Sequence, residues 1–345
     1  PGEVIKDIAG WLRDDDRYVR GAAVEALAKL GDRIPGEVIK DIAGWLRDDD
    51  RYVRGAAVEA LAKLGDRIPG EVIKDIAGWL RDDDSDVRGA AVEALAKLED
   101  RVPEEAIKDI AGRLRDDNRY VREATVEALA VFKNRVPEEA IKDIAGLLRD
   151  DNRYVRAVAV GALAKLVDRL PEEVIKDIAA RLRDDEWYVH GAAVEALAKL
   201  KDRVPGEVIK DIAGWLRDDD RYVRGAAVEA LAVFKDRLPE EAIKDIAGLL
   251  RDDNRYVRAV AVEALAKLED RVPGEVIKEI AARLRDDKGY VRETAVEALA
   301  KLEDRLPEEV IKDIAARLRD DKGYVRESAY RTLKIFYESG IPLPG

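Results

Sequence analysis

Apolar residues recur along the chain at helical spacing in two alternating patterns. The first covers roughly residues 1–13 and places apolar side chains three or four positions apart, at Val4, Ile5, Ile8, Ala9 and Leu12. Such spacing predicts a helix with one apolar face. The second covers roughly Arg17 to Leu30 and is apolar on most of its circumference, with only Tyr18, Glu25 and Lys29 forming a polar stripe. We therefore expect this second helix to be surrounded by other helices.

The segments between these patterns carry turn and capping residues. Asp14, Asp15 and Asp16 separate the two apolar patterns, and an aspartate at this place can accept a hydrogen bond from the first free N–H groups of the second helix. Residues 31–33 then lead to a proline that opens the next apolar pattern. The basic unit is therefore a pair of antiparallel helices.

This pair is a 34-residue unit that repeats ten times. Residues 1–34 recur without change at 35–68, and further copies with substitutions begin at residues 69, 103, 137, 171, 205, 239, 273 and 307. A fixed period of this length is typical of repeat architectures in which one helical unit stacks on copies of itself. We expect an all-α solenoid of ten stacked helix pairs with the first helix of each pair outside and the second lining a concave side. The unbroken period favours a single domain over residues 1–345.

The two ends of the chain differ. In the last unit, residues 307–345, Tyr330, Thr332, Lys334 and Tyr337 replace smaller or apolar residues, which predicts a polar C-terminal cap. The first unit has no such changes. Its apolar flank suggests either a fragment of a longer chain or end-to-end self-association through this uncapped repeat.

The run from Leu12 to Leu27 resembles the HEAT repeat in its short, HEAT-like form. The matching features are the aspartate before the turn, the pair Val19-Arg20, and the alanine–leucine pattern of the second helix. The resemblance covers all ten units and implies a right-handed α-solenoid, most often a protein-binding scaffold. It also implies that residues matching Asp14 and Arg20 pair to form a ladder along the stack. HEAT-like repeats occur in some lyase and DNA-repair folds as well, so the motif alone specifies no function.

Differences among the ten units indicate which positions could serve function. We expect the concave face to bind a partner through the residues Tyr18, Tyr52, Tyr120, Tyr154, Trp187, Tyr188, Tyr222 and Tyr256. An alternative patch lies where one position of the first helix is tryptophan, at Trp11, Trp45, Trp79 and Trp215. Other units have leucine or arginine there, which favours packing at the edge of the core. His190, the single histidine, replaces the ladder arginine; a lost rung explains it more simply than a pH switch.

Composition argues against most catalytic chemistry. The 345 residues include no cysteine and one histidine, so neither a zinc cluster of His and Cys nor a Cys-His pair can form. Phosphate-binding glycine loops are missing, and the acidic triplets lack the spacing of a calcium loop. We expect no enzymatic activity, cofactor or metal. The net charge is −12 with no basic stripe, which argues against nucleic-acid binding.

The sequence thus predicts a non-catalytic scaffold that binds another protein. Three alternatives stay open: the ligand-sensing array of a larger NTPase-coupled, immune-type signalling protein, an engineered consensus scaffold without natural ligand, or a nucleic-acid-processing HEAT-like enzyme. The identical first two units and the lack of methionine agree with the second. No signal peptide or membrane-spanning run is visible, so we expect no membrane association, and the cytoplasm is favoured as compartment.

Overall fold

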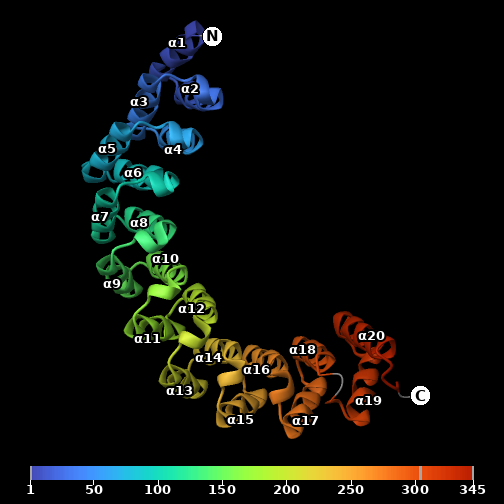
Figure 1. Ribbon diagram of the computed structural model, residues 1–345. Coiled ribbons are helices and arrows are strands. Elements are labelled where there is room, and N and C mark those ends of the chain that lie inside the picture. The colour runs from blue at the N-terminus through green and yellow to red at the C-terminus, as the bar shows by residue number, and fades with distance from the viewer. Residues whose placement is uncertain (1, 303–304, 344–345) are drawn as a thin grey trace. The chain divides into compact units, whose positions relative to one another are not determined.

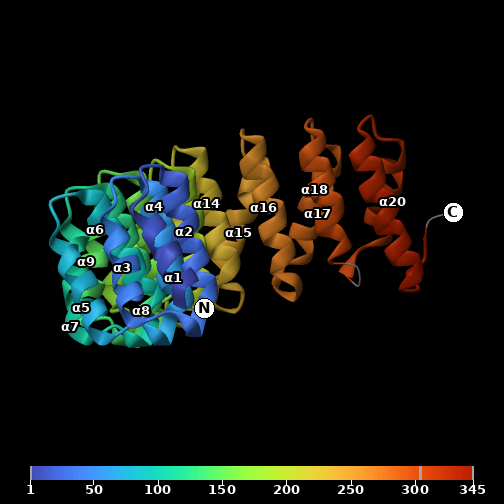
Figure 2. The same cartoon turned by 90° about the horizontal axis from the view of Figure 1, so that it is seen from above.

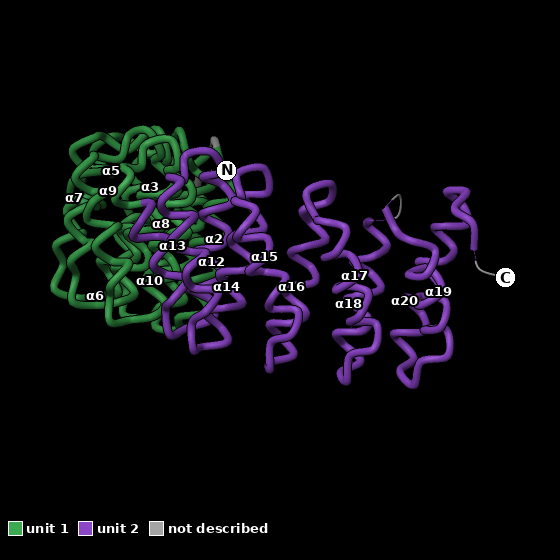
Figure 3. Tube along the Cα trace, turned by 90° about the horizontal axis from the view of Figure 1, so that it is seen from below, with its two compact units in different colours: residues 1–174 green, residues 175–345 purple. Residues whose placement is uncertain are grey.

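The computed structural model describes residues 2–302 and 305–343, and these residues form helices and turns without any β-strand (Figure 1). They divide into two compact units, residues 1–174 and 175–345 (Figure 3). Each unit is a stack of helix pairs, so the predicted α-solenoid of antiparallel pairs is confirmed. The expectation of a single domain over the whole chain stays a prediction.

Two α-helices come from each repeat. In the first compact unit they are α1 (Gly2–Gly10), α2 (Arg17–Leu30), α3 (Gly36–Gly44), α4 (Arg51–Leu64), α5 (Gly70–Gly78), α6 (Ser85–Lys97), α7 (Glu104–Ala111), α8 (Arg119–Phe132), α9 (Glu138–Gly146) and α10 (Arg153–Leu163). The others are α11 (Glu172–Ala180), α12 (Trp187–Leu200), α13 (Gly206–Gly214), α14 (Arg221–Val233), α15 (Glu240–Gly248), α16 (Arg255–Lys267), α17 (Gly274–Ala282), α18 (Gly289–Ala300), α19 (Glu308–Ala316) and α20 (Gly323–Glu338).

Each odd-numbered helix is shorter than its apolar pattern because its last turn tightens into a 3₁₀-helix. In the first repeat α1 ends at Gly10 and a 3₁₀ turn covers Trp11–Arg13, closed by a hydrogen bond of 3.2 Å from the Asp14 N–H to the Trp11 carbonyl. The second helix has the bounds that the sequence predicted, Arg17–Leu30. Asp16 caps it by accepting a 2.8 Å hydrogen bond from the Tyr18 N–H, which confirms the predicted capping turn.

Further 3₁₀ turns follow most helices. After the odd-numbered helices they are Trp45–Arg47, Trp79–Arg81, Gly112–Arg115, Leu147–Arg149, Arg181–Arg183, Trp215–Arg217, Leu249–Arg251, Arg283–Arg285 and Arg317–Arg319. After the even-numbered helices they are Gly31–Arg33, Gly65–Arg67, Glu99–Arg101, Lys133–Arg135, Val167–Arg169, Lys201–Arg203, Lys235–Arg237 and Glu269–Arg271. The first residue of several of the latter turns has positive φ, as at Gly31 (50°) and Gly65 (41°).

Within each compact unit the even-numbered helices form the inner layer and the odd-numbered helices the outer layer (Figure 1). Successive even-numbered helices pack closely, as α16, α18 and α20 do side by side in Figure 2, whereas successive odd-numbered helices touch over few positions. Small residues such as Ala23 and Ala57 are fully buried between the inner helices and permit this close approach. A stack that is tighter on one side is concave there, as expected from the sequence.

The ends of the described chain differ in exposure. Val4 is 58% exposed, whereas the equivalent Val72 and Val208 of inner repeats are buried. In the last repeat α20 is longer than the other inner helices, and its Tyr330 side chain is exposed. Thr332, expected on the polar cap, is buried instead. Self-association through the first repeat stays a prediction.

Candidate functional site

Tyrosine and charged residues form regular rows along the inner layer. The predicted residues Tyr18, Tyr52, Tyr120, Tyr154, Trp187, Tyr222 and Tyr256 are all exposed, and Tyr188 is half-buried. Each tyrosine is the second residue of an even-numbered helix, just after the capping turn, and the Tyr188 hydroxyl is buried. Tyr290 and Tyr324 occupy the same register and are also exposed. They belong to the row as well, and the 34-residue period alone could have identified them.

Arginines hold several of these rings in place. The Arg17 guanidinium lies 5.0 Å from the centroid of the Tyr18 ring, and Arg119 lies 4.4 Å from that of Tyr120. Arg119 also donates a 2.6 Å hydrogen bond to the Tyr120 hydroxyl. Such cation–π and hydrogen-bond contacts restrict the rotamers of the ring before any partner binds, which lowers the entropy cost of binding.

Glycine lies close to three tyrosines of the row, with Gly289 against the Tyr324 hydroxyl and the other two against ring carbons. A Cβ added to Gly21 would lie 2.4 Å from Cε1 of Tyr52, and one added to Gly225 would lie equally close to Tyr256. Tyr52 therefore lies flat over α2, with its ring centroid 6.0 Å from that of Tyr18. Gly55 is the identical position one repeat later, but it has no atom within 4 Å of such a Cβ. The next repeat has Asp86 in place of the tyrosine.

This difference gives a matched pair of substitutions. We expect Gly55→Ala to raise the free energy of unfolding by about 0.5–1 kcal/mol, because alanine favours the helix over glycine and meets open space. Gly21→Ala should gain less, since the Tyr52 ring must leave its place on α2. Urea unfolding of both variants, with the Tyr52 ring signals followed by NMR, measures the difference. Equal gains with an unmoved Tyr52 would contradict the close approach.

Carboxylates form a second row on the same face. Glu25, Glu59 and Glu93 line a groove of about 680 Å³ across α2, α4 and α6, together with Tyr52 and Lys63. Partial burial raises the pKa of Glu93, and the neighbouring Glu127 and Glu59 raise it further. In the second compact unit burial likewise raises the pKa of Glu229, although the Tyr256 hydroxyl donates a 3.2 Å hydrogen bond to it.

An arginine–aspartate ladder supports the inner layer from one end of the helices. Arg88 donates two hydrogen bonds, of 2.7 and 2.8 Å, to the carboxylate of Asp116 in the next repeat, and its other guanidinium nitrogen caps the carbonyls of Asp82 and Asp83. Equivalent rungs join Arg20 to Asp48, Arg122 to Asp150, Arg224 to Asp252, Arg258 to Asp286 and Arg292 to Asp320. The ladder implied by the HEAT resemblance is thus present, and each rung joins adjacent repeats.

In the described part of the chain, the repeats that contain Arg54 and His190 depart from the ladder, and an outer arginine compensates in both. Arg54 binds Asp86 instead of Asp82, and Arg47 then pairs with Asp82 at 3.1 Å. His190 lies against the Asp184 carbonyl, and Arg183 pairs with Asp218 at 3.2 Å. His190 therefore keeps the contact within its own repeat, while Arg183 supplies the charge for the next one.

Restoring the arginine should strengthen this point of the stack. We expect His190→Arg to raise the free energy of unfolding by about 1–2 kcal/mol, because a guanidinium there can bind Asp218 through two charge-assisted hydrogen bonds. Arg183 would then no longer be needed at Asp218 and could form an ion pair with a carboxylate of the outer layer, as Arg217 does with Asp245. Thermal unfolding of both proteins measures the gain, and an unchanged or lower stability would show that Arg183 already replaces the rung in full.

A second set of arginines supports the opposite end of the helices, and the sequence did not reveal it. Arg237 donates hydrogen bonds of 3.0 and 2.6 Å to the carbonyls of Lys201 and Val204 in the preceding repeat. Arg67, Arg101, Arg135, Arg169, Arg271 and Arg305 make the same kind of contact. These carbonyls belong to the 3₁₀ turn after the preceding inner helix and to the residue before the next proline, and the Lys201 carbonyl also accepts a 3.2 Å hydrogen bond from the Val204 N–H. The strict recurrence of arginine before each proline was the available signal.

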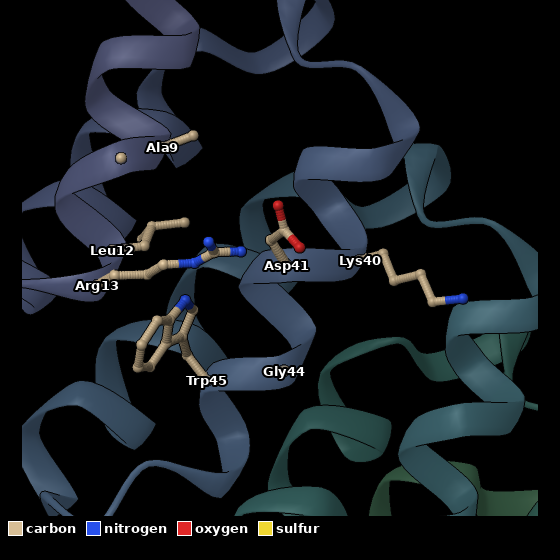
Figure 4. A pocket seen from close by; sticks show the side chains of 8 residues that line it. Ala9, Leu12, Arg13, Lys40, Asp41, Gly44 and Trp45 are labelled. Carbon is tan, nitrogen blue, oxygen red and sulfur yellow. The ribbon is translucent and has the colours of Figure 1, made fainter.

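The alternative tryptophan patch lies at the outer layer. Trp45, Trp79 and Trp215 are half-buried, which agrees with a position at the edge of the core, and Trp11 is 57% exposed. Figure 4 shows the pocket beside Trp45, of about 510 Å³, with Arg13 reaching between the indole ring and Asp41. The tryptophans follow the odd-numbered helices of the outer layer and the tyrosines begin the even-numbered helices of the inner layer, so the two predicted surfaces are distinct.

Within residues 2–302 and 305–343, no group of three or more His, Asp or Glu side chains is arranged to hold a metal ion. In the same part of the chain, every helix is too short or too polar to cross a lipid bilayer.

Comparison with known proteins identifies the repeat. A family model described as HEAT repeats matches residues 5–96, 39–130, 107–198, 141–232, 175–266 and 243–334. A search of the curated proteins found no match.

Among solved structures, the chain resembles one describing Kap95p bound to RanGDP (TM-score 0.80, 14% identity) and yeast importin-beta, Kap95p (0.77, 15%). It also resembles Kap121p bound to Nup53p (0.70, 15%). Each match covers 98% of this chain but only 50%, 51% and 41% of the other, so the chain spans about half or less of these relatives. At this identity the likeness shows the fold, and the family model decides the assignment: the chain belongs to the HEAT repeat family.

Proposed function

We propose that the chain is a non-catalytic scaffold that binds another protein on the inner face, meaning the exposed side chains of its even-numbered helices. The observation that supports this most is the row of exposed tyrosines, several of which arginines hold in place. Tyrosine supplies a large contact area and a hydrogen-bonding hydroxyl at a low cost in side-chain entropy. The ladder beneath keeps successive rings in register within a compact unit.

The similar solved structures agree with this proposal. Their titles name protein partners, RanGDP for Kap95p and Nup53p for Kap121p. Those partners belong to those proteins, and they indicate only that proteins of this fold can bind other proteins. The tryptophan patch on the outer layer is the competing surface.

Affinity capture with two variants distinguishes the surfaces. One variant replaces Tyr18, Tyr52, Tyr120 and Tyr154 by alanine, and the control replaces Trp45 and Trp79 by alanine. We expect proteins retained by the unaltered chain to be lost from the tyrosine variant and kept by the control. Retention by the tyrosine variant together with loss from the tryptophan variant would assign binding to the outer layer. Circular dichroism of each variant verifies that it is folded.

A further inference from the structure

The first and last repeats each expose a surface that the internal repeats bury against a neighbour. On the first repeat Val4 is 58% exposed, whereas the equivalent Val72 is fully buried. On the last repeat Leu318 is 42% exposed, whereas the equivalent Leu284 is fully buried. We call the surface of α1 and α2 around Val4 the leading flank, and the surface of α19 and α20 around Leu318 the trailing flank. Both present apolar side chains that elsewhere pack on an adjacent helix pair.

The trailing flank carries one half of an arginine–aspartate rung. In a complete rung, Nη1 of Arg292 donates to the Asp286 carbonyl of its own turn, while Nε and Nη2 donate to the Asp320 carboxylate of the next repeat. Nη1 of Arg326 likewise donates to the carbonyls of Asp320 and Asp321. Within residues 2–302 and 305–343, Nε and Nη2 of Arg326 have no hydrogen-bond partner, and this side chain is exposed. Two of its nitrogens are therefore available to a further carboxylate.

The leading flank carries the other half of a rung. The Asp14 carboxylate accepts a 2.9 Å hydrogen bond from the Asp16 N–H. Aspartates of complete rungs are held in the same way, as Asp320 is by the Lys322 N–H at 3.0 Å. In the described part of the chain Asp14 makes no ion pair, and it is half-buried where the equivalent Asp48 is buried. The acceptor is thus held in place without its arginine.

A second pair of open charges lies in the outer layer. Arg285 pairs with Asp313 of the next repeat at 2.7 Å. The same two positions of the repeat are Arg319 on the trailing flank and Asp7 on the leading flank. Both side chains are exposed, and among the described residues neither has an ion-pair partner. The flanks therefore offer two donors and two acceptors in the register that adjacent repeats use.

The other charges of the leading flank are mainly acidic. Asp15 and Asp16 belong to it, because their equivalents Asp49 and Asp50 form ion pairs with arginines of the preceding repeat. Arg33 is the basic exception. Its equivalents donate to carbonyls of the preceding 3₁₀ turn, and on the trailing flank α20 continues as a helix through the place of that turn. Carboxylates thus outnumber the single arginine on this surface.

The trailing flank has the opposite character. Its glutamates are already paired on their own helix, Glu327 with Arg331 and Glu338 with Lys334. The two arginines without a carboxylate therefore determine the charge that this flank presents to another molecule. An apolar and acidic surface at one end of the chain is complementary to an apolar and basic surface at the other.

We propose that the leading flank of one copy of the chain binds the trailing flank of a second copy. Arg326 of one copy completes a rung with Asp14 of the other, and Arg319 pairs with Asp7. The exposed apolar side chains of both flanks become buried. Each copy presents one flank of each kind, so association is not limited to two copies. This contact does not use the tyrosine row and is independent of the proposed function.

Charge reversal of the outer-layer pair tests the contact on the full chain. We expect sedimentation velocity at low salt to give an average mass that rises with concentration beyond that of a dimer. Asp7→Arg places like charges opposite each other and should weaken association about tenfold, and Arg319→Asp should do the same. Glu71→Arg changes the net charge as Asp7→Arg does, at an exposed residue of α5 outside both flanks, and should leave association unchanged.

Mixing the two variants tests whether these residues face each other. Every contact between an Asp7→Arg chain and an Arg319→Asp chain joins opposite charges, whichever flank each chain contributes. We expect the equimolar mixture to associate about as strongly as the unaltered chain, although each variant alone does not. For the inner rung, Asp14→Asn keeps an oxygen for the Asp16 N–H and should weaken association roughly threefold.

A gain of association tests the fit of the trailing flank. Tyr330 and Lys334 stand where the first repeat has Val24 and Ala28, which are buried. Replacing Tyr330 by valine and Lys334 by alanine restores the surface that the first repeat presents to the second. Because the first two repeats are identical, this surface already fits a leading flank of the same sequence. We expect the double variant to strengthen association about tenfold.

Three results would overturn the proposal. One is a mass of a single chain at every concentration. Another is a closed dimer that Arg319→Asp does not weaken, which would assign the contact to two leading flanks. The third is a mixture of the reversed variants that associates no better than either alone. None of these results affects capture by the tyrosine row, which the preceding experiment decides on its own.

Discussion

Replacing Arg88 with alanine is expected to lower the free energy of unfolding by about 3–5 kcal/mol. The Asp116 carboxylate that Arg88 binds has a side chain only 2% exposed, so the variant removes both hydrogen bonds from a buried charge and leaves it only the more distant Arg113, 3.8 Å away. It also removes the donor from the carbonyls of Asp82 and Asp83, which lie in the turn before α6. Urea unfolding followed by tryptophan fluorescence measures the loss.

Arg326 provides the matched control for this substitution. It donates to the carbonyls of Asp320 and Asp321 as Arg88 does to its own turn, but within the described residues it binds no carboxylate. We therefore expect Arg326→Ala to cost only about 1–2 kcal/mol, the value of its carbonyl contacts. Equal losses in the two variants would mean that the rung between repeats adds nothing.

A double-mutant cycle isolates the rung itself. Removing Asp116 along with Arg88 eliminates the uncompensated charge, so the double variant should be more stable than Arg88→Ala alone. If the double variant instead loses the sum of both single effects, Arg88 and Asp116 act independently and the ladder does not couple their repeats.

The sequence predicted the helices well because their signals are local. The bounds of α2, Arg17–Leu30, follow from the apolar pattern between a capping aspartate and a glycine. Asp16 directly precedes the first residue of this helix, and Gly31 directly follows the last one. The exposed tyrosines could be predicted for the same reason: each lies two residues after its capping position and outside the apolar pattern of its helix. Periodicity then carries one correct assignment to every repeat.

Contacts between repeats were less accessible from the sequence. Arg237 reaches carbonyls 33 and 36 residues earlier, and nothing near it in the chain indicates their presence. At the two irregular rungs, Arg47 and Arg183 of the outer layer form the ion pairs with the ladder aspartates of the next repeat. Whether their side chains can reach these carboxylates depends on the packing of neighbouring repeats. The clash at Gly21 but not at Gly55, in two identical repeats, depends only on the residue that the next repeat provides. Such features follow from the packing of one repeat against the next, and the sequence of a single repeat does not specify its neighbour.

The pH dependence of stability should show two opposite effects, and the first appears on mild acidification. The pKa values of Glu93 and Glu229 are raised in the folded protein, chiefly by burial. A carboxyl group of this kind favours the folded state when it is protonated, so its contribution is complete below the unfolded pKa and is lost as the pH rises through the folded pKa. Lowering the pH from neutrality toward 5 should therefore stabilise the protein slightly.

Below pH 4 the ladder aspartates should reverse this gain and unfold the protein. Burial opposes ionisation of Asp320, but hydrogen bonds from Arg292 and the Lys322 N–H outweigh it and lower its pKa to about 2. The pKa of Asp116, Asp150 and Asp252 is also lowered, by their own arginines against the same opposing burial. Each such group stabilises the fold above its unfolded pKa and loses that effect as the pH falls through the folded value.

With on the order of 1 kcal/mol lost per rung, the four rungs together are expected to cost several kcal/mol between pH 4 and 2. Circular dichroism at a fixed urea concentration across this range measures the loss. Arg88→Ala has one depressed aspartate fewer, so its stability should fall less steeply with acid even though it starts lower. A slope equal to that of the unaltered chain, or a transition above pH 5, would show that groups other than the ladder aspartates control acid unfolding.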